Sequence, residues 1–195
     1  SSLSGVGRIL GENKNLWYQR SFIIPSKWKG KKILLHFGAV DWKTEVWVNN
    51  IKVGEHTGGF TPFSFDITQA LDGSKNTLVV KVWDPTDKGT QPRGKQVSQP
   101  RGIWYTPVSG IWQTVWLEPV ADHYITNVRT TPDIDTNGVK VKVETDNDRV
   151  SDKFEVKVFD EGQLVAMGTS INGLPVEISM PVDVKLWSPD NPFLY

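Results

Sequence analysis

The chain has 195 residues, of which 38% are hydrophobic and 23% are charged. It carries 22 Lys and Arg residues against 22 Asp and Glu residues, and it has no cysteine. This balance excludes the strong positive field that is typical of proteins binding nucleic acid or anionic membranes. Without cysteine there is no disulfide framework, Cys-based metal site or thiol nucleophile. No apolar run approaches the roughly 20 residues that cross a bilayer, so no membrane contact is expected. The compartment stays open, with a periplasmic or secreted protein favoured over a cytoplasmic one.

Strand signals follow one another along the chain, because runs rich in Val, Ile, Phe, Trp and Thr alternate with clusters of Gly, Pro, Asn and Asp. Helical periodicity is nearly absent. The first series of expected strands is 17–24, 32–37, 43–49, 63–67, 76–84 and 111–118, and the second is 124–131, 138–145, 153–160, 163–170 and 175–180. Short strands without intervening amphipathic helices predict an all-β protein built of sandwiches.

Two domains are expected, joined near residues 118–122. Eight of the nine tryptophans precede this joint, so the first block has aromatic-rich loops and the second is plainer. The second block alternates cleanly, as at Val141 and Val143, which is typical of an immunoglobulin-like sandwich. Such a sandwich takes about 100 residues and seven strands, so we expect this domain to be incomplete at its C-terminus.

The hairpin VWVNNIKVG places Trp47 and Asn49 on one face of a strand. Asn49 and Asn50 suit the left-handed conformations of a tight turn, so Asn49 either makes the turn alone or also contacts a ligand. Downstream, His56 is expected to order the loop at Gly58 and Gly59.

The stretch GIWYTPVSGIWQTVWLE (102–118) concentrates aromatic residues around two turns. The expected strand 111–118 is apolar on both faces, so most of this surface is interpreted as core. Trp104 and Tyr105 lie in the preceding loop, where aromatic rings suit the stacking of a sugar or docking against another domain.

The loop 84–102 is rich in Pro and Gly and carries four cations, among them Arg93 and Lys95. These cations either face an acidic sugar such as a glucuronide or keep an interdomain loop soluble. The three histidines lack metal-ligand spacing, so no metal is predicted. No Gly-rich loop joins a strand to a helix, so no nucleotide cofactor is predicted either.

Several motifs stand in an order that resembles a known family: WYQRSFIIP, HFGAVDWKTEVWVNN, GEHTGGFTPFSFDIT, NTLVVKVWD, SGIWQTVWLE and, late in the chain, LWSPDNPFLY. They resemble the N-terminal half of glycoside hydrolase family 2, the family of β-galactosidases, β-glucuronidases and β-mannosidases. The resemblance implies a jelly-roll sugar-binding domain over residues 1–120 and an immunoglobulin-like domain over 121–195. It also implies that Asn49 reaches the sugar in the active site.

The resemblance implies that the catalytic glutamates lie on a (β/α)₈ barrel. In the family this barrel follows the two domains, and it takes about 250 residues. The chain is therefore interpreted as a noncatalytic N-terminal fragment of a retaining β-glycosidase, with no catalytic residue of its own and the barrel as its partner. A β-galactoside is the expected substrate. A carboxylate that some β-galactosidases carry before the SGI motif has no counterpart at residues 102–105, so β-glucuronides and β-mannosides stay open.

The alternative function is an autonomous carbohydrate-binding module. Its exposed aromatic platform would consist of Trp47, Trp104 and Tyr105. Homo-oligomerisation is left open.

Overall fold

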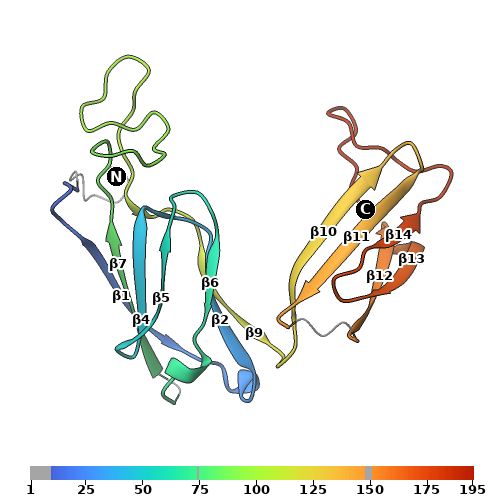
Figure 1. Cartoon of the computed structure of the whole chain (residues 1–195), viewed down its shortest axis with the longest axis horizontal. Coiled ribbons are helices and arrows are strands. Elements are labelled where there is room, and N and C mark those ends of the chain that lie inside the picture. Colours follow the sequence, from blue (N-terminus) through green and yellow to red (C-terminus); the bar gives the residue numbers. More distant parts are fainter. Residues whose placement is uncertain (1–9, 74, 148–150) are drawn as a thin grey trace. The chain divides into compact units, whose positions relative to one another are not determined.

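The computed structural model describes residues 10–73, 75–147 and 151–195. The prediction of an all-β protein is confirmed, because within these residues the only helical segments are two single 3₁₀ turns, η1 (Ser26–Trp28) and η2 (Thr68–Ala70). The chain divides after Asp122 into two compact units, which are drawn in Figure 1. No helix of the described ranges is both long enough and apolar enough to span a membrane.

The first unit is a β-sandwich. One sheet has the order β1-β7-β4-β5, and the facing sheet has the order β6-β2-β9. The first sheet consists of β1 (Leu16–Ile23), β7 (Lys75–Trp83), β4 (Lys43–Val48) and β5 (Ile51–Thr57). The second consists of β6 (Phe63–Asp66), β2 (Lys32–Phe37) and β9 (Val115–Val120), and a short pair is formed by β3 (Val40–Asp41) and β8 (Gly110–Ile111).

Strand alternation builds the core of this unit. Val46 and Val48 of β4 are fully buried, as are Val80 and Val82 of β7, whereas the residues between them face outward. They pack against the inner face of β2, which supplies the core residues Ile33, Leu35 and Phe37. Full burial of each large aliphatic or aromatic side chain contributes about 1.5–3 kcal/mol. This core fixes the strands whose ends carry the loops.

The expected strand 111–118 is wrong as a single strand, because the structure interrupts it between β8 and β9. At the break, Trp112 and Gln113 both donate backbone hydrogen bonds to the carbonyl of Ala39, and Gly38 N–H donates to Thr114 O at 2.9 Å. Two amides sharing one carbonyl cannot continue a regular ladder. Trp112 therefore lies outside the regular strand that carries Trp116.

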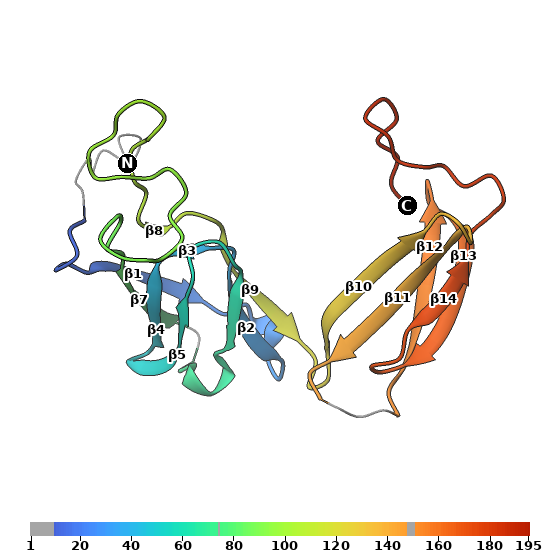
Figure 2. The same ribbon diagram turned by 45° about the horizontal axis from the view of Figure 1, so that its top comes forward.

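A long loop, residues 84–109, connects β7 to β8. Figures 1 and 2 show it in light green, extending beyond the ends of the strands of the first unit, with β3 and β8 at its base. Because β4 is antiparallel to β7 and pairs Lys43 with Trp83, the loop leaves the sheet at the Lys43 end of β4.

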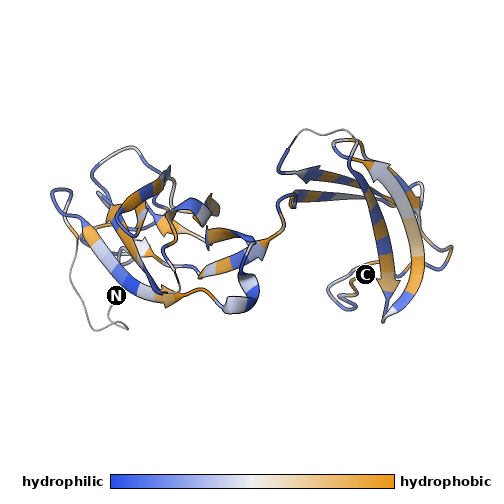
Figure 3. Ribbon diagram, turned by 90° about the horizontal axis from the view of Figure 1, so that it is seen from below, coloured by the Kyte–Doolittle hydropathy of each residue, from blue (hydrophilic) through white to orange (hydrophobic). Residues whose placement is uncertain are grey.

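The second unit also has two layers. One sheet is β10-β11-β14 and the other is β12-β13. The strands are β10 (Ile125–Asp133), β11 (Gly138–Thr145), β12 (Lys153–Asp160), β13 (Gln163–Ile171) and β14 (Val176–Ser179). Its core contains Val141, Val143, Val176 and Ile178, against which alternate residues of β12 pack. Figure 3 shows the alternation as bands of hydrophobic and hydrophilic colour along these strands.

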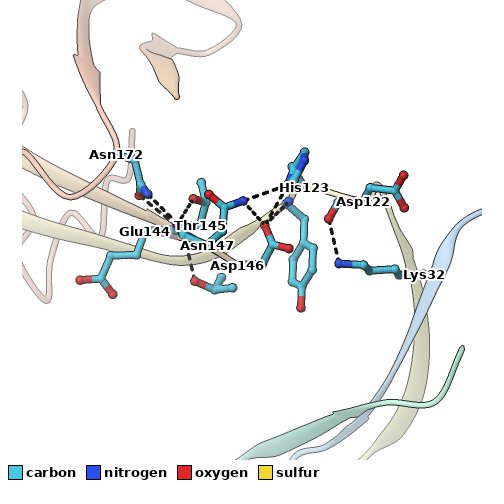
Figure 4. Close-up of polar contacts among 10 residues, drawn as sticks. Lys32, Asp122, His123, Glu144, Thr145, Asp146, Asn147 and Asn172 are labelled. Carbon is cyan, nitrogen blue, oxygen red and sulfur yellow. Dashed lines mark hydrogen bonds and ion pairs between the residues drawn. The ribbon is translucent and has the colours of Figure 1, made fainter. Parts of the chain in front are cut away.

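Polar side chains order one end of the second unit, as Figure 4 shows. Asn172, which is only 8% exposed, accepts a hydrogen bond from Thr145 N–H at 3.1 Å and donates one to Asn147 O at 2.9 Å. Asn147 Nδ2 lies 2.9 Å from His123 Nδ1 and 3.2 Å from Asp146 Oδ1. These contacts join β11 to the turn after β13 and to the first residues of the unit.

Candidate functional site at the loop end of the first unit

The loop 84–109 is held in shape by its own side chains. Asp87 accepts hydrogen bonds from the backbone N–H and the hydroxyl of Ser98, at 2.9 and 2.7 Å. These bonds hold the pKa of Asp87 below its usual range, because they stabilise the charged carboxylate. Gln96 Oε1 accepts from Val108 N–H at 2.5 Å. The loop is therefore an ordered surface rather than a slack connection.

Two buried carboxylates lie beneath the loop. Asp41, at the end of β3, is 7% exposed, and Asp84, directly after β7, is 3% exposed. Asp84 accepts hydrogen bonds from Thr86 N–H at 2.7 Å and from the Ser109 hydroxyl. Burial, and then repulsion from Asp84, raise the pKa of Asp41 to about 6. Both ends of the loop are thus fastened at Asp84, and Arg93 lines the small cavity beside the two acids.

The Gly58-Gly59 turn closes over Asp41 and connects two of the sequence motifs. A Cβ atom on Gly59 would lie 2.6 Å from Asp41 Oδ1, so only glycine fits there without a shift. The indole of Trp112 donates to Gly59 O at 2.7 Å, and the ring of Phe60 meets that indole edge to face at 6.1 Å between centroids. The aromatic residues of GGF and SGIW therefore hold each other in place.

An apolar groove of about 630 Å³ lies beside this contact, lined by Gly38, Phe60, Pro62, Trp112, Gln113, Thr114 and Trp116. Its two indoles are each 44% exposed. Partly exposed aromatic rings with an amide nearby suit the apolar C–H face of a sugar or the surface of another domain.

Trp104 and Tyr105 are exposed on the loop, at 39% and 54%. Tyr105 N–H donates to Lys95 O at 3.0 Å, and Tyr105 O accepts from Val97 N–H at 3.2 Å, which forms a short bridge across the loop. Trp104 N–H donates to Arg101 O at 3.0 Å. The bridge brings the backbone of Tyr105 against the segment that contains Lys95.

Neither Arg93 nor Lys95 forms an ion pair with any residue that the structure describes. Arg93 is half-buried and Lys95 is exposed. The exposed Lys95 is therefore available to an anionic group of a ligand. Arg93 instead lines the cavity beside Asp41 and Asp84.

His56, near the end of β5, supports the same end of the sandwich. Its ring stacks on Phe63 at 4.1 Å between centroids, and its Nε2 lies 3.2 Å from Thr61 Oγ1. Burial lowers its pKa, because the charged imidazolium is less well solvated there. His56 is therefore placed to order the loop that contains Gly58 and Gly59.

Trp47 and Asn49 lie toward and just beyond the other end of β4, about 14 Å and about 20 Å from Lys43 at roughly 3.4 Å per residue. Asn49 has a φ of 48°. Its amide donates to Ala70 O at 2.9 Å and to Asn76 Oδ1 at 2.7 Å, and it accepts from Thr77 N–H at 2.9 Å. These are the contacts of a turn residue, and a sugar contact by Asn49 stays a prediction.

The structure does not bring Trp47 together with Trp104 and Tyr105. Trp47 faces outward from β4 and stacks on Trp17 of β1, whereas the loop lies beyond the opposite end of that strand. The remaining predicted residues belong to segments at the Lys43 end of the sheet: His56, Arg93, Lys95, Trp104 and Tyr105.

Sequence reasoning missed Asp41 and Asp84. The available signal was a carboxylate inside an apolar segment, since Asp41 stands between Val40 and Trp42 and Asp84 follows Trp83. An acidic residue between strand-forming apolar residues is a candidate for burial, and a buried acid needs partners. Among the described residues, no group of three or more His, Asp or Glu side chains is arranged to hold a metal ion.

Two family models match the chain. The first, described as the sugar binding domain of glycosyl hydrolases family 2, matches residues 6–119, and the second, described as glycosyl hydrolases family 2, matches residues 123–195. The chain belongs to glycosyl hydrolase family 2.

Individual relatives are similar over nearly the whole chain. A β-galactosidase of Thermoanaerobacter pseudethanolicus is 30% identical over 190 residues, covering 92% of this chain and 25% of that protein. A β-glucuronidase of Paenibacillus borealis is 28% identical over 197 residues, covering 93% and 32%. The solved β-glucuronidase of Lactobacillus rhamnosus is 29% identical with a TM-score of 0.71, covering 91% and 31%. The chain thus spans about a quarter to a third of the length of these relatives.

Proposed function

We propose that this chain is the noncatalytic, sugar-binding portion of a retaining β-glycosidase, and that its loop 84–109 forms one wall of the sugar site. The observation that carries the proposal is the ordered loop, which exposes Trp104 and Tyr105 and also carries Lys95 and Arg93. Its partner is the catalytic domain, which supplies the two carboxyl groups that a retaining glycosidase needs about 5–5.5 Å apart.

The described carboxylates support a binding role. Asp41 and Asp84, which lie beneath the loop, are both more than nine-tenths buried. Asp87 of the loop itself is hydrogen-bonded to Ser98. A catalytic acid must come within hydrogen-bonding distance of the glycosidic oxygen. Carboxylates that are buried beneath a loop hold that loop in place and do not reach a substrate. We therefore assign the catalytic carboxylates to the catalytic domain and the positioning of the sugar to this chain.

A β-galactoside is the proposed substrate of the complete enzyme, and a β-glucuronide is the second candidate. One observation favours the glucuronide: Arg93 and Lys95 form no ion pair with a described residue and lie in the same loop as Trp104 and Tyr105. Cations outside ion pairs suit a sugar carboxylate. No described residue of the site favours a β-mannoside over these two substrates.

The test is steady-state kinetics of the complete enzyme with Trp104→Ala and Tyr105→Ala. We expect kcat/KM to fall by about tenfold or more for each, because loss of a positioning contact costs at least about 1.4 kcal/mol. Trp187→Ala, which removes an exposed indole of the second unit, is the matched control and should leave kcat/KM unchanged. Equal kinetics for all three variants would refute a loop contribution to the sugar site.

Arg93→Ala and Lys95→Ala separate the two substrates. If the substrate is a glucuronide, these variants lose kcat/KM on aryl β-glucuronides but not on aryl β-galactosides. The isolated 195-residue chain should hydrolyse neither, and turnover that copurifies with it through several columns would overturn the noncatalytic assignment.

An autonomous carbohydrate-binding module is the competing function. Titration of the indole N–H signals of the isolated chain with galactose and glucuronic acid, up to tens of millimolar, distinguishes the two. Saturable shifts of Trp104 would favour the autonomous module, since mM binding corresponds to only about −4 kcal/mol. Their absence would favour a wall that needs the catalytic domain.

A further inference from the structure

A second aromatic surface lies on the first unit, on the outer face of the sheet β1-β7-β4-β5. Register defines it: Trp17 of β1 pairs with Lys81 of β7, and Lys81 pairs with Glu45 of β4. These residues alternate with the buried core residues of the same strands, so their side chains point away from the core. We call this surface the outer sheet face, made up of Asn15, Trp17, Lys43, Glu45, Trp47, Lys52, Glu55, Lys81 and Trp83.

Two indoles form the middle of the outer sheet face. Trp17 is 58% exposed and stacks on Trp47 with centroids 5.9 Å apart and an interplanar angle of 26°. The ammonium groups of Lys81 and Lys52 lie 5.9 Å and 6.0 Å from the centroids of Trp17 and Trp47. Cations at this distance from a ring face are attracted to it. The two lysines thus hold both indole rings in position, and the rings together form a broad apolar surface that is exposed to solvent.

An ion-pair network fixes the polar groups around these two rings. Glu45 contacts Lys81 at 2.7 Å and Lys52 at 3.0 Å, and Lys52 also contacts Glu55 at 2.9 Å. Hydrogen bonds from Lys81, and then from Lys52, lower the pKa of Glu45. Both carboxylates are therefore compensated, and three lysines stand against two glutamates on this face.

One cation on the outer sheet face has no such partner. Lys43 is exposed and makes no ion pair within the described residues, and it lines a groove of about 270 Å³ with Asn15, Glu45, Lys81 and Trp83. The amide of Asn15 likewise has no hydrogen-bond partner in the described part of the chain. Trp83 is held by a hydrogen bond from its indole to Glu12 O at 2.7 Å. The groove is slightly smaller than the roughly 300 Å³ at the lower end of drug-sized sites, a size suited to a single sugar ring.

We propose that the outer sheet face binds an acidic oligosaccharide, one whose residues include uronic acids. The apolar face of one pyranose ring stacks on Trp17, and the carboxylate of a neighbouring ring occupies the groove and pairs with Lys43. Asn15 supplies hydrogen bonds to ring hydroxyls. Lys43 makes no ion pair with a described residue, although the hydrogen bond from Lys52, and then the charges of Lys52 and Lys43, lower the pKa of Glu55. With three lysines against two glutamates, the face carries a net positive charge, which favours an anionic glycan over a neutral one. This site is separate from the loop site and does not rest on the proposed function.

The test is an NMR titration of the 195-residue chain, labelled at its indole nitrogens, with a trimer of galacturonic acid. A neutral galactose trimer of the same linkage is the matched probe. We expect saturable shifts of the Trp17 and Trp47 signals, a Kd of about 1–10 mM for the acidic trimer, and binding of the neutral trimer about fivefold weaker or more.

Two variants test the contacts independently. Trp17→Ala should abolish saturable binding of both trimers, whereas Lys43→Gln should weaken the acidic trimer about fivefold and leave the neutral one unchanged. Lys27→Gln, an exposed lysine in η1 away from this face, is the control and should bind like the parent chain. The dispersion of the remaining indole signals verifies that each variant is folded.

Three outcomes would overturn the proposal. The acidic trimer could leave Trp17 and Trp47 unshifted at tens of millimolar. The shifts could be confined to Trp104, which would place sugar at the loop and leave the proposed function intact. Trp17 could shift with protein concentration in the absence of sugar, which would identify a second copy of the chain as the occupant of this face.

Discussion

Asn49 illustrates how one residue can carry two interpretations until its contacts are known. Its amide makes three hydrogen bonds that link the β4–β5 turn to η2 and to the start of β7. One partner, Asn76, is 1% exposed. The amide of Asn49 therefore finds partners for its nitrogen and its oxygen inside the fold, and a buried group left without its partner is costly.

We expect Asn49→Ala to lower the free energy of unfolding by about 2–3 kcal/mol, because it removes these bonds and the left-handed preference of asparagine. Asn50→Ala is the control: its φ of 68° is also left-handed, so it should cost only about 1 kcal/mol. Urea unfolding followed by tryptophan fluorescence measures both. Equal losses for the two variants would contradict the structural role of the Asn49 amide.

Asp41 is a carboxyl group whose ionised form the fold disfavours. Its pKa is raised to about 6 from 3.8, so between these values the folded state binds more protons than the unfolded state. The free energy of unfolding therefore falls as pH rises through this window, and it is insensitive to Asp41 below and above it.

We expect Asp41→Asn to remove this slope. Between pH 4 and 6.5 the parent chain should lose about 2–3 kcal/mol relative to the variant, measured by urea unfolding at each pH. Asp87→Asn serves as the control of opposite sign, since the pKa of Asp87 is lowered and its carboxylate stabilises the fold as pH rises. Parallel pH profiles for the parent and Asp41→Asn would contradict a raised pKa of Asp41 in the folded state.

At the scale of elements, β8 is the strand that ties the long loop to the sandwich. It pairs only with β3, through Val40 with Ile111 and Asp41 with Gly110. Gly110 has a φ of 92°, and a Cβ atom there would lie 2.1 Å from the hydroxyl of Tyr18. That same hydroxyl accepts from Ile111 N–H at 3.1 Å. The glycine of the SGIW motif is thus required by backbone conformation and by close packing against β1.

Gly110→Ala should cost about 3 kcal/mol, the sum of a strained φ and a displaced Tyr18 ring. Gly11→Ala, where a Cβ would meet nothing within 4 Å, should change stability by less than about 0.5 kcal/mol. Thermal unfolding followed by near-UV circular dichroism compares them. If Gly110→Ala is as stable as Gly11→Ala, then β8 and Tyr18 are not packed as described.

At the scale of the whole molecule, the two units differ in the size of their cores. Among the described residues, the first unit has ten buried residues in one hydrophobic cluster, from both of its main sheets, and the second has four. The sheet β12-β13 has only two strands, each with one paired edge. Less buried apolar surface and fewer paired strands mean lower local stability.

We therefore expect backbone amides of β12 and β13 to exchange with solvent at least about tenfold faster than those of β2 and β4. Hydrogen exchange followed by mass spectrometry, on a sample confirmed as monomeric, measures this directly. Uniformly slow exchange across both units would contradict it.

The sequence by itself determined the all-β architecture, because alternating apolar residues between turn-forming residues have one low-energy arrangement, a half-buried strand. It also determined family membership, because the glycines and aromatic residues of the motifs contact one another in the fold. The indole of Trp112 donates a hydrogen bond to Gly59 O, and Gly110 leaves room for the ring of Tyr18. Such local requirements are written in residue type and order.

The tertiary structure alone decided which residues share a site. Asn49 and Trp47 are close in sequence to His56, yet they lie at the opposite end of β4, because a hairpin reverses the chain. Asp41 and Asp84 are 43 positions apart in the numbering and become one buried pair only through the pairing of β3 with β8 and the return of the loop. Strand register and loop path depend on long-range packing, and no local pattern encodes them.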